Sequence, residues 1–313
     1  MSETRIGLTH DTPQASSLLL VGTLALVWGC NWPVMKLGVT EIAPLTFRAS
    51  TIAFAGIGLL LASRLSGESL RIPRRMWSKV IIMGLFNIGG WNALILFGVQ
   101  QLPAGRSAIL AFTMPVWAVL LSKALLHEPL SRRKLIGMLF GMAGMALLLG
   151  EDIRHVQRAP AGALLILAAA ASWAFGTVLL RRWKLALPQN TLTGWMMVIG
   201  WVPIVLVAPL LDPHALASLA AMSSVGWFAV LYNIFLAGTL AHWAWFRMAR
   251  TLPVAVSSLS SLPVPVVGVL SGMVILGERP GAAELVALGL VLVALVAVLS
   301  APKGSAETVT PME

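Results

Sequence analysis

The chain has too few charged residues to form the surface of a water-soluble protein. Asp, Glu, Lys and Arg make up 11% of its 313 residues, whereas a typical soluble chain carries about 25%. Hydrophobic residues account for 58%, and the mean hydropathy is +0.87. A large apolar core needs a polar coat that this composition does not supply. The shortage excludes a soluble globular protein and predicts an integral membrane protein.

Carboxylates are missing from the middle of the long apolar runs. All twelve Asp and Glu residues fall in predicted tails, loops or span ends. Coupling to protons or sodium usually requires a carboxylate at membrane depth. His242 is the one residue inside a run that titrates in the useful range. We therefore expect facilitated movement of a solute rather than strong proton coupling.

Motifs for enzymatic chemistry are also missing. Membrane proteases and acyltransferases need a buried Asp pair, an H-E-x-x-H helix or a Ser/His or His/Asp constellation. The runs contain no Asp, and His242 has no acidic neighbour. The single cysteine, Cys30, cannot form an intrachain disulfide and is interpreted as a small hydrophobic residue. The sequence therefore predicts no enzyme, no metal site and no cofactor, and without a Walker motif it implies no ATPase subunit.

The basic residues predict the orientation. The net charge is +10 and the pI is near 11.0, but Lys and Arg occur in short clusters between apolar runs, which argues against a nucleic-acid partner. If the N-terminus lies inside, most of the 22 Lys and Arg residues fall on the cytoplasmic side. Residues 1–15 are polar, and the following run is too long for a cleaved signal peptide. We expect a multi-pass protein of a bacterial-type inner membrane with both termini cytoplasmic.

Ten apolar runs are long enough to cross a bilayer as helices. They lie near residues 16–36, 43–63, 78–99, 104–125, 133–150, 160–180, 190–210, 224–246, 254–276 and 282–300. The predicted organisation is an N-terminal tail (1–15), a first five-helix unit (16–150), a second five-helix unit (160–300) and a C-terminal tail (301–313). The lipid bilayer is therefore a predicted partner.

An internal repeat relates the two units. The series Leu102, Pro103, Ala104, Ser107, Pro115 and Glu128 recurs 150 positions later as Leu252, Pro253, Val254, Ser257, Pro265 and Glu278. Trp28 and Trp173 mark the opening spans at a similar offset of 145. Because each unit has five helices, the second enters the membrane from the opposite side. The predicted fold is all-α transmembrane, with ten helices in two inverted five-helix repeats.

These motifs resemble the drug/metabolite transporter superfamily and, within it, the EamA-type ten-helix exporters. The resemblance covers residues 16–300 and rests on the order and spacing of weak motifs. They are Trp28-Gly29 with Asn31-Trp32, Pro44 and Arg48, then Ala108, Pro115, Glu128, Gly137, Gly141 and Gly144, and finally Pro253-Val254-Ala255, Pro263, Pro265 and Glu278. Overall the chain looks most like the YddG amino-acid exporters. The resemblance implies a secondary transporter of a small molecule such as an amino acid.

Polar and aromatic side chains near the middle of the spans are the candidates for substrate binding. They are Asn31, Trp32, Asn87, Trp91, Met114, Trp117, Trp173, Tyr232, His242, Trp243 and Ser257. Asparagine amides can donate to a carboxylate and accept from an ammonium group, and an indole face attracts a cation. The alternative is that the polar groups join helices and the tryptophans are scaffold or lipid-facing.

Prolines and isolated charges within the runs receive separate interpretations. Pro115 and Pro265 are repeat-equivalent and are predicted hinges, with a static bend as the alternative. Arg48 is expected to snorkel or to pair with backbone carbonyls, with contact to a substrate carboxylate as the alternative. Glu128 and Glu278 are interpreted as anchors of loops and helix ends.

The function predicted from these observations is export of small neutral or aromatic amino acids by alternating access through a central cavity lined by Trp and Asn. An exporter of drugs, lipids or other amphiphilic metabolites is the closest alternative. A channel is a weaker one, because the spans contain neither a ring of repeated charges nor a carbonyl-filter motif.

Overall fold

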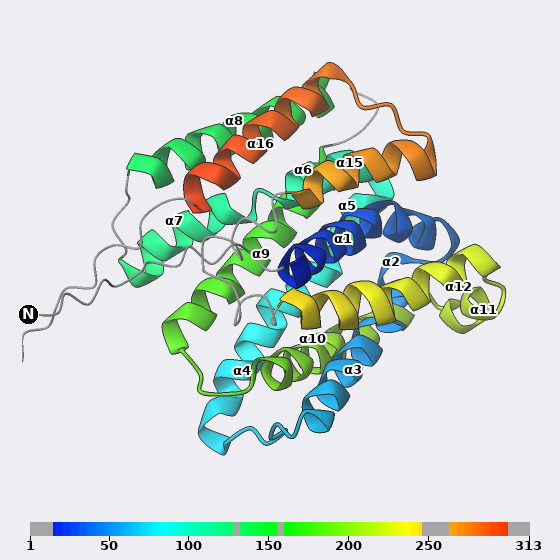
Figure 1. Cartoon of the computed structure of the whole chain (residues 1–313). Coiled ribbons are helices and arrows are strands. Elements are labelled where there is room, and N and C mark those ends of the chain that lie inside the picture. Colours follow the sequence, from blue (N-terminus) through cyan, green and yellow to red (C-terminus); the bar gives the residue numbers. More distant parts are fainter. Residues whose placement is uncertain (1–14, 128–131, 155–159, 246–262, 300–313) are drawn as a thin grey trace, which may run out of the picture.

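The computed structural model describes residues 15–127, 132–154, 160–245 and 263–299, and every regular element in these ranges is a helix (Figure 1). Lipid offers no hydrogen bonds to an exposed backbone, so a chain this apolar must pair its own amide and carbonyl groups within helices. The predicted tails, Ser257, Glu128 and the beginning of the predicted ninth span lie outside the described residues.

Five spans form the first half, and three of them consist of more than one helical segment. In chain order they are α1 (Ala15–Glu41), α2 with α3 (Pro44–Ala49 and Ile52–Leu65), η1 with α4, η2 and α5 (Arg74–Met76, Trp77–Met83, Gly84–Gly90 and Trp91–Gln101), α6 with α7 (Ala104–Ala111 and Met114–Leu126), and α8 (Arg132–Arg154).

The second half repeats this order. Its spans are α9 (Ala161–Trp183), α10 (Gln189–Leu211), α12 with η3 (Ser224–Leu231 and Tyr232–Leu240) continuing to Trp245, α15 (Pro263–Leu276) and α16 (Ala282–Leu299). A short helix that the sequence analysis did not predict, α11 (Ala215–Ala220), lies in the connection before α12.

Lengths and composition confirm the predicted fold class. Seven helical stretches in the described residues are long and apolar enough to cross a membrane, and three shorter apolar helices, Leu135–Leu148, Pro263–Leu276 and Ala282–Ala297, supply the remaining spans. The shorter three belong to the fifth, ninth and tenth spans. The molecule is therefore an all-α membrane protein with ten spans.

Helix packing has the symmetry of a duplication. The closing helices of the two halves, α8 and α16, pack side by side (Figure 1). Span 1 packs on span 9 and span 6 on span 4, while span 3 packs on span 6 and span 8 on span 1. Span 2 packs on span 7. Exchanging the two halves leaves this set of contacts unchanged, as expected for two repeats.

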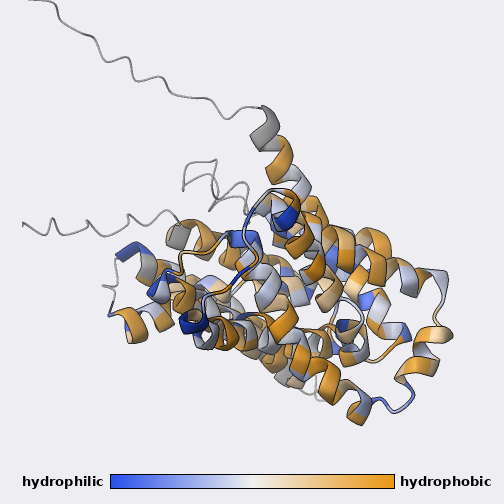
Figure 2. Ribbon diagram, turned by 90° about the horizontal axis from the view of Figure 1, so that it is seen from below, coloured by the Kyte–Doolittle hydropathy of each residue, from blue (hydrophilic) through white to orange (hydrophobic). Residues whose placement is uncertain are grey.

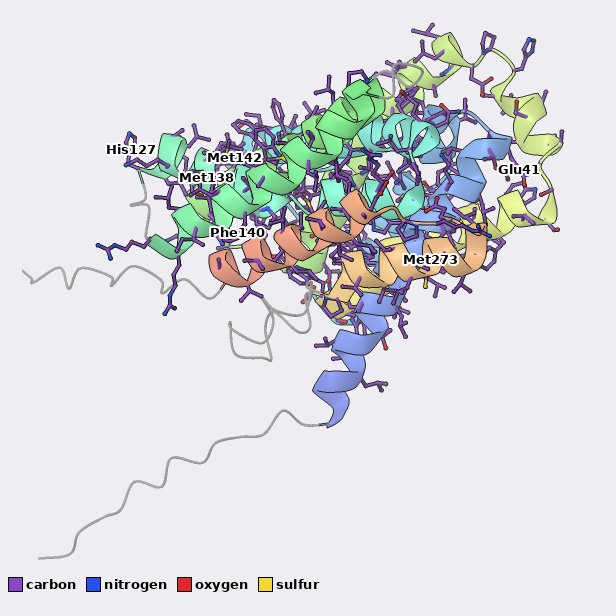
Figure 3. The ribbon with its side chains drawn as sticks, turned by 90° about the horizontal axis from the view of Figure 1, so that it is seen from above. Glu41, His127, Met138, Phe140, Met142 and Met273 are labelled. Carbon is purple, nitrogen blue, oxygen red and sulfur yellow. The ribbon has the colours of Figure 1, made fainter. Side chains whose placement is uncertain are left out.

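The two ends of the bundle can be told apart from its connections. Glu41, which ends span 1, and His127, which ends span 4, lie at opposite ends of the molecule (Figure 3). The end that carries Glu41, α11 and the turn Gly277–Gly281 is called the α11 end below.

The outer surface of the bundle suits lipid. Hydrophobic residues continue along the helices, and hydrophilic ones gather at turns and ends (Figure 2). Large apolar side chains such as Leu206 and Val274 are exposed by 67% and 85%. In the interior, helices approach closely at small residues: a Cβ added to Gly200 in α10 would lie 2.7 Å from the backbone nitrogen of Gly89 in η2. Such close backbone contact is typical of membrane helix packing.

Candidate functional site

Two aromatic pairs, each containing one of the repeat-equivalent residues Trp28 and Trp173, lie inside the bundle. Trp91, at the beginning of α5, packs edge-on against Trp173 of α9, with ring centroids 5.3 Å apart. Trp28 of α1 packs edge-on against His242 of the eighth span, also at 5.3 Å. Trp28 and Trp173 are equivalent positions of the two halves. Each pair therefore joins the first span of one half to the third span of the other half. Edge-to-face packing is a favourable arrangement of two rings.

Hydrogen bonds join the same two spans beside each aromatic pair. Asn87 of η2 donates from Nδ2 to the carbonyl of Trp173 at 2.9 Å and to Thr177 Oγ1 at 3.2 Å. Tyr232 of η3 donates from its hydroxyl to the carbonyl of Val27 at 2.8 Å. Asn87 and Tyr232 are 145 positions apart, the same offset as Trp28 and Trp173. The amide hydrogens of Asn87 therefore join spans 3 and 6.

The supporting residues lie in π-helical segments. Both η2 (Gly84–Gly90) and η3 (Tyr232–Leu240) are π-helices, one in the third span and one in the eighth. A π-helix widens each turn by one residue, changes which side chains face the neighbouring helix and often marks a functional site. Here each segment directly precedes the helical turn that carries Trp91 or His242.

Two polar atoms near the middle of the membrane are buried without a partner in the described structure. They are Oδ1 of Asn31, an acceptor, and Nε1 of Trp117, a donor. Asn31 precedes the end of α1 at Glu41 by ten residues, which is about 15 Å of helix. Half of a hydrocarbon core is also about 15 Å. Buried polar atoms almost always have a partner, so these two are suited to meet a ligand or water.

Arg48 occupies a different environment from the one predicted. The prediction that it snorkels or pairs with backbone carbonyls is wrong, because its side chain is only 7% exposed and bonds side chains instead. Nη1 donates to Oδ1 of Asn233 at 3.1 Å, and Nη2 contacts Sδ of Met35 at 2.9 Å. Nε is buried and has no partner. An uncompensated buried ion costs several kcal/mol even after relaxation.

The other predicted site residues lie in several environments. Trp32 is 4% exposed and belongs to the core, where a Cβ on Gly268 would lie 3.1 Å from its indole ring. Trp243 is half-buried against the cluster formed by spans 2, 3, 6 and 7. Met114 begins α7 and is half-buried. The structure therefore brings Trp91 and Trp173 together and Trp28 and His242 together, and it places Trp32 in the protein core.

Of the two predicted hinge residues, Pro115 stands at the beginning of a helix. Span 4 is interrupted between α6 and α7, and Pro115 is in the first turn after the break. Thr113 bridges the break, because its hydroxyl donates to the carbonyl of Leu110 at 2.7 Å. Pro265 is the third described residue of α15, and the residues before Pro263 lie outside the described part of the chain. Proline fits a first turn because that turn needs no amide donor.

Polar contacts tie helices together at the α11 end. Lys36 Nζ donates to the carbonyls of Val99, Gln100 and Leu102, each at 2.8 Å. Glu41 accepts from the backbone nitrogen of Ser223 at 2.8 Å and also from its hydroxyl. These contacts join span 1 to spans 3 and 8.

Glu278 ties the second half to the first at the same end. Its carboxylate accepts from the backbone nitrogens of Ala104 at 2.6 Å and Gly105 at 3.0 Å, the first residues of α6. A carboxylate at a helix N-terminus satisfies unpaired amides and complements the helix dipole. This confirms the interpretation of Glu278 as an anchor of a helix end.

The opposite end has its own contacts, between spans 2 and 7. The hydroxyls of Ser63 and Thr191 are hydrogen-bonded at 2.7 Å, and the indole of Trp195 donates to the carbonyl of Leu70 at 3.0 Å. Within the described residues, no group of three or more His, Cys, Asp or Glu side chains is placed to hold a metal ion.

Comparison with solved structures supports the architecture. One crystal structure matches with a TM-score of 0.63 at 22% sequence identity, covering 90% of this chain and 96% of that chain. At this identity the likeness shows a common fold.

Several curated relatives with the names of transporters match this chain over most of their length. The chain is 24% identical to "Uncharacterized transporter YoaV" of Bacillus subtilis, covering 84% of this chain and 89% of that protein. It is 28% identical to "Uncharacterized inner membrane transporter YedA" of Escherichia coli, covering 88% of each. It is 26% identical to "Probable amino-acid metabolite efflux pump" of Salmonella typhimurium, covering 82% and 85%.

The family model for EamA-like transporters matches the chain twice, over residues 15–150 and 160–300. The two matches fall on the two groups of five spans, so the duplication described above is the one that the family model recognises. With most of its length matched, the chain belongs to the EamA-like transporter family of the drug/metabolite transporter superfamily.

Proposed function

We propose that this protein exports small neutral or aromatic amino acids by alternating access, as a YddG-like member of its family. The observation that carries the proposal is the arrangement near the membrane centre. Two aromatic pairs that join the halves, Trp91 with Trp173 and Trp28 with His242, accompany a free acceptor on Asn31 and a free donor on Trp117. A relative that matches over most of its length is named a probable amino-acid metabolite efflux pump.

The chemistry of these groups suits an amino acid. Oδ1 of Asn31 accepts from an ammonium group, and the indole N–H of Trp117 donates to an acceptor on the rest of the substrate. Aromatic faces attract an ammonium group by about 0.5–2 kcal/mol and bury an apolar side chain. Met114 and Trp243 extend the apolar surroundings, and Ser257 is retained as a substrate contact from its place in the repeat. Pro115 and Pro265 serve as hinges of spans 4 and 9.

The proposed organisation places both tails, residues 1–15 and 301–313, in the cytoplasm of a bacterial inner membrane, on either side of units 16–150 and 160–300. The α11 end then faces outward. Single cysteines at Ser66 and His214 in a Cys30→Ser background test this arrangement. A membrane-impermeant maleimide should label His214→Cys and spare Ser66→Cys in intact cells, and the reverse pattern would invert the topology.

Transport is tested with the purified full-length chain in proteoliposomes, by uptake and counterflow of labelled methionine, threonine and phenylalanine with unlabelled competitors. Saturable, competable counterflow supports a carrier for amino acids. The matched control is Trp227→Leu, because Trp227 is 46% exposed at a span end and should leave flux unchanged. Flux of amphiphilic drugs without flux of any amino acid would replace the proposal with a drug exporter, which aromatic surfaces also suit.

Energy coupling is part of the proposal. The titratable ring near the site, His242, packs on Trp28, and its Nδ1 lies 3.1 Å from the carbonyl of Ala237. We expect equal transport rates with and without an imposed pH gradient. Acceleration by the gradient that disappears in His242→Ala would contradict facilitated transport.

A further inference from the structure

The buried guanidinium of Arg48 lacks a counter-ion. In the described part of the chain its hydrogen bonds go to one amide oxygen and one thioether, its central carbon lies 5.7 Å from the centroid of the Phe47 ring, and no ion pair joins it to a carboxylate. A carboxylate does reach the same helix, but Asp212 accepts instead from the hydroxyl of Thr46 at 2.7 Å. Buried cations in proteins are normally paired, so Arg48 has capacity for an anion that the described chain does not supply.

The unused donors of Arg48 lie on one edge of the guanidinium. Nη1 is occupied by Asn233, whose own Nδ2 is fixed on the carbonyl of Ala229 at 3.0 Å. Nε has no partner, and Nη2 meets only the sulfur of Met35, a weak acceptor. Nε and Nη2 together form the edge that binds the two oxygens of a carboxylate in parallel. The contacts that position Arg48 therefore leave its bidentate edge open.

Arg48 is connected to one of the aromatic pairs through adjacent residues. Asn233, which holds Arg48, follows Tyr232, and Tyr232 donates to the carbonyl of Val27. Val27 precedes Trp28, which packs on His242. Arg48 follows the beginning of α2 at Pro44 by four residues, about 6 Å of helix. It lies between the α11 end and the Trp28/His242 pair.

The second half supplies no such charge. The positions that correspond to Arg48 at offsets of 144 and 145 are Leu192 and Thr193, both buried. Neutral side chains are therefore sufficient for helix packing at this position, and packing does not require a charged one. The cation belongs to one half and one side of the bundle, as expected for a group that meets an asymmetric ligand.

From this geometry we infer that Arg48 binds the carboxylate of the transported molecule through Nε and Nη2, and that the substrate is a monocarboxylate. The inference deepens the proposed function and rests on it for the identity of the substrate as an amino acid. Binding replaces the thioether of Met35 at Nη2, while Asn233 keeps Nη1 in place. A single guanidinium matches a single carboxylate, so an amine without a carboxylate binds weakly. Arg48 acts here as a specificity residue.

The test compares carboxylate ligands with their carboxamides in thermal-shift measurements on the purified full-length protein. The pairs are phenylalanine with phenylalaninamide, methionine with methioninamide, and 3-phenylpropionate with its amide. We expect the unchanged protein to prefer each carboxylate by about tenfold or more in half-saturating concentration, as for a charge-assisted bidentate contact. In Arg48→Gln the preference should fall to about one.

Two further variants separate ligand recognition from packing. Arg48→Lys keeps the charge but loses the planar edge, so the preference should fall several-fold; it also serves if Arg48→Gln does not fold. Met35→Leu removes the competing sulfur and should keep or increase the preference. Arg106→Gln is the matched control, since Arg106 donates to the carbonyl of Leu148 and pairs with Glu284 at the α11 end, and it should not change the preference.

The outcomes distinguish this inference from the proposed function. Stabilisation by 3-phenylpropionate but by neither amino acid, lost in Arg48→Gln, supports the role of Arg48 and contradicts amino-acid export. A carboxylate preference that persists in both Arg48→Gln and Arg48→Lys overturns the inference even if amino acids are transported. Absence of stabilisation by every carboxylate in the unchanged protein also overturns it.

Discussion

The opening spans of the two halves carry the same tryptophan but differ one turn later. Span 1 has Asn31 where span 6 has Gly176, counted from Trp28 and Trp173. At Gly176 the chain of η2 comes so close that an added Cβ would lie 2.8 Å from the backbone nitrogen of Asn87. At Asn31 the amide oxygen is buried and unpaired. One copy of the repeat therefore uses this position for packing, and the other keeps a polar atom available.

The same division holds for the charged residue in span 2. Arg48 is buried in the first half, and Leu192 and Thr193 occupy the corresponding region of the second. A duplicated bundle supplies two similar frames, and at these two positions the polar group suited to binding lies in the first half. The variants below test how far this difference extends to the rest of the site.

The largest expected effect comes from filling the close contact in the second half. Gly176→Ala brings a methyl group against backbone atoms of Asn87 that cannot rotate away, and such overpacking should cost about 1–3 kcal/mol. We expect little folded protein by size-exclusion chromatography in detergent. Gly289→Ala is the control, because nothing lies within 4 Å of a Cβ there. Normal folding of Gly176→Ala would show that spans 3 and 6 pack less closely than described.

The aromatic pairs offer the next largest effect. Trp28→Leu and Trp173→Leu remove the ring that each opening span contributes. Loss of an aromatic face costs about 0.5–2 kcal/mol of cation binding, so the half-saturating concentration in counterflow should rise about 2- to 30-fold. The substitutions Trp28→Phe and Trp173→Phe keep an aromatic ring and should retain most of the affinity. An effect at Trp28 alone would place the substrate entirely beside the first opening span.

Asn31→Ala should weaken binding without weakening the fold. Its Oδ1 has no partner to lose, and deleting an unpaired buried acceptor is neutral or stabilising. A ligand hydrogen bond contributes about 1 kcal/mol, which is roughly a fivefold change in half-saturation. Thermal unfolding and counterflow measured on the same preparation check both parts. A clear loss of thermal stability would instead assign Asn31 to packing.

The smallest effects are expected at the hydrogen bonds beside the aromatic pairs. Tyr232→Phe removes one bond between spans and Asn87→Ala removes two, and such bonds contribute about 0.6 kcal/mol each on average in membranes. Both variants should lower thermal stability by small amounts, Asn87→Ala by about twice as much as Tyr232→Phe. A much larger effect of Asn87→Ala on counterflow than on stability would return Asn87 to the substrate contacts predicted from the sequence.

The span pattern was predictable because hydropathy alone decides it. Every predicted run corresponds to a helix that begins or ends within a few residues of the prediction, except where 254–262 lies outside the described residues. The breaks after Ala49 and Ala111, the π-segments η2 and η3, and helix α11 were not predicted. Breaks and π-segments arise where backbone carbonyls change their hydrogen-bond partners, as at Leu110, whose carbonyl accepts from the hydroxyl of Thr113. The apolar composition of a run does not reveal these changes.

The candidate site was predictable as a residue list but not as contacts. The repeat marked Trp28 and Trp173 as equivalent, whereas their partners His242 and Trp91 follow from the widened turns of η3 and η2. Asn233 is a polar residue of the same apolar run as Tyr232 and His242, but the sequence did not reveal that it holds Arg48. The available signal was a lone arginine in an apolar run, which requires a polar residue on a facing helix.

The contacts at the α11 end have a consequence for the timing of opening. Lys36 on three carbonyls, Glu41 on Ser223 and Glu278 on the first amides of α6 are short, directional bonds. Such bonds weaken steeply with stretching and bending. A slight separation of the helices therefore costs bond energy and opens no path until the contacts break. In the alternating access proposed above, the open and closed arrangements would then exchange abruptly, and the time before these contacts break would set the rate of the cycle.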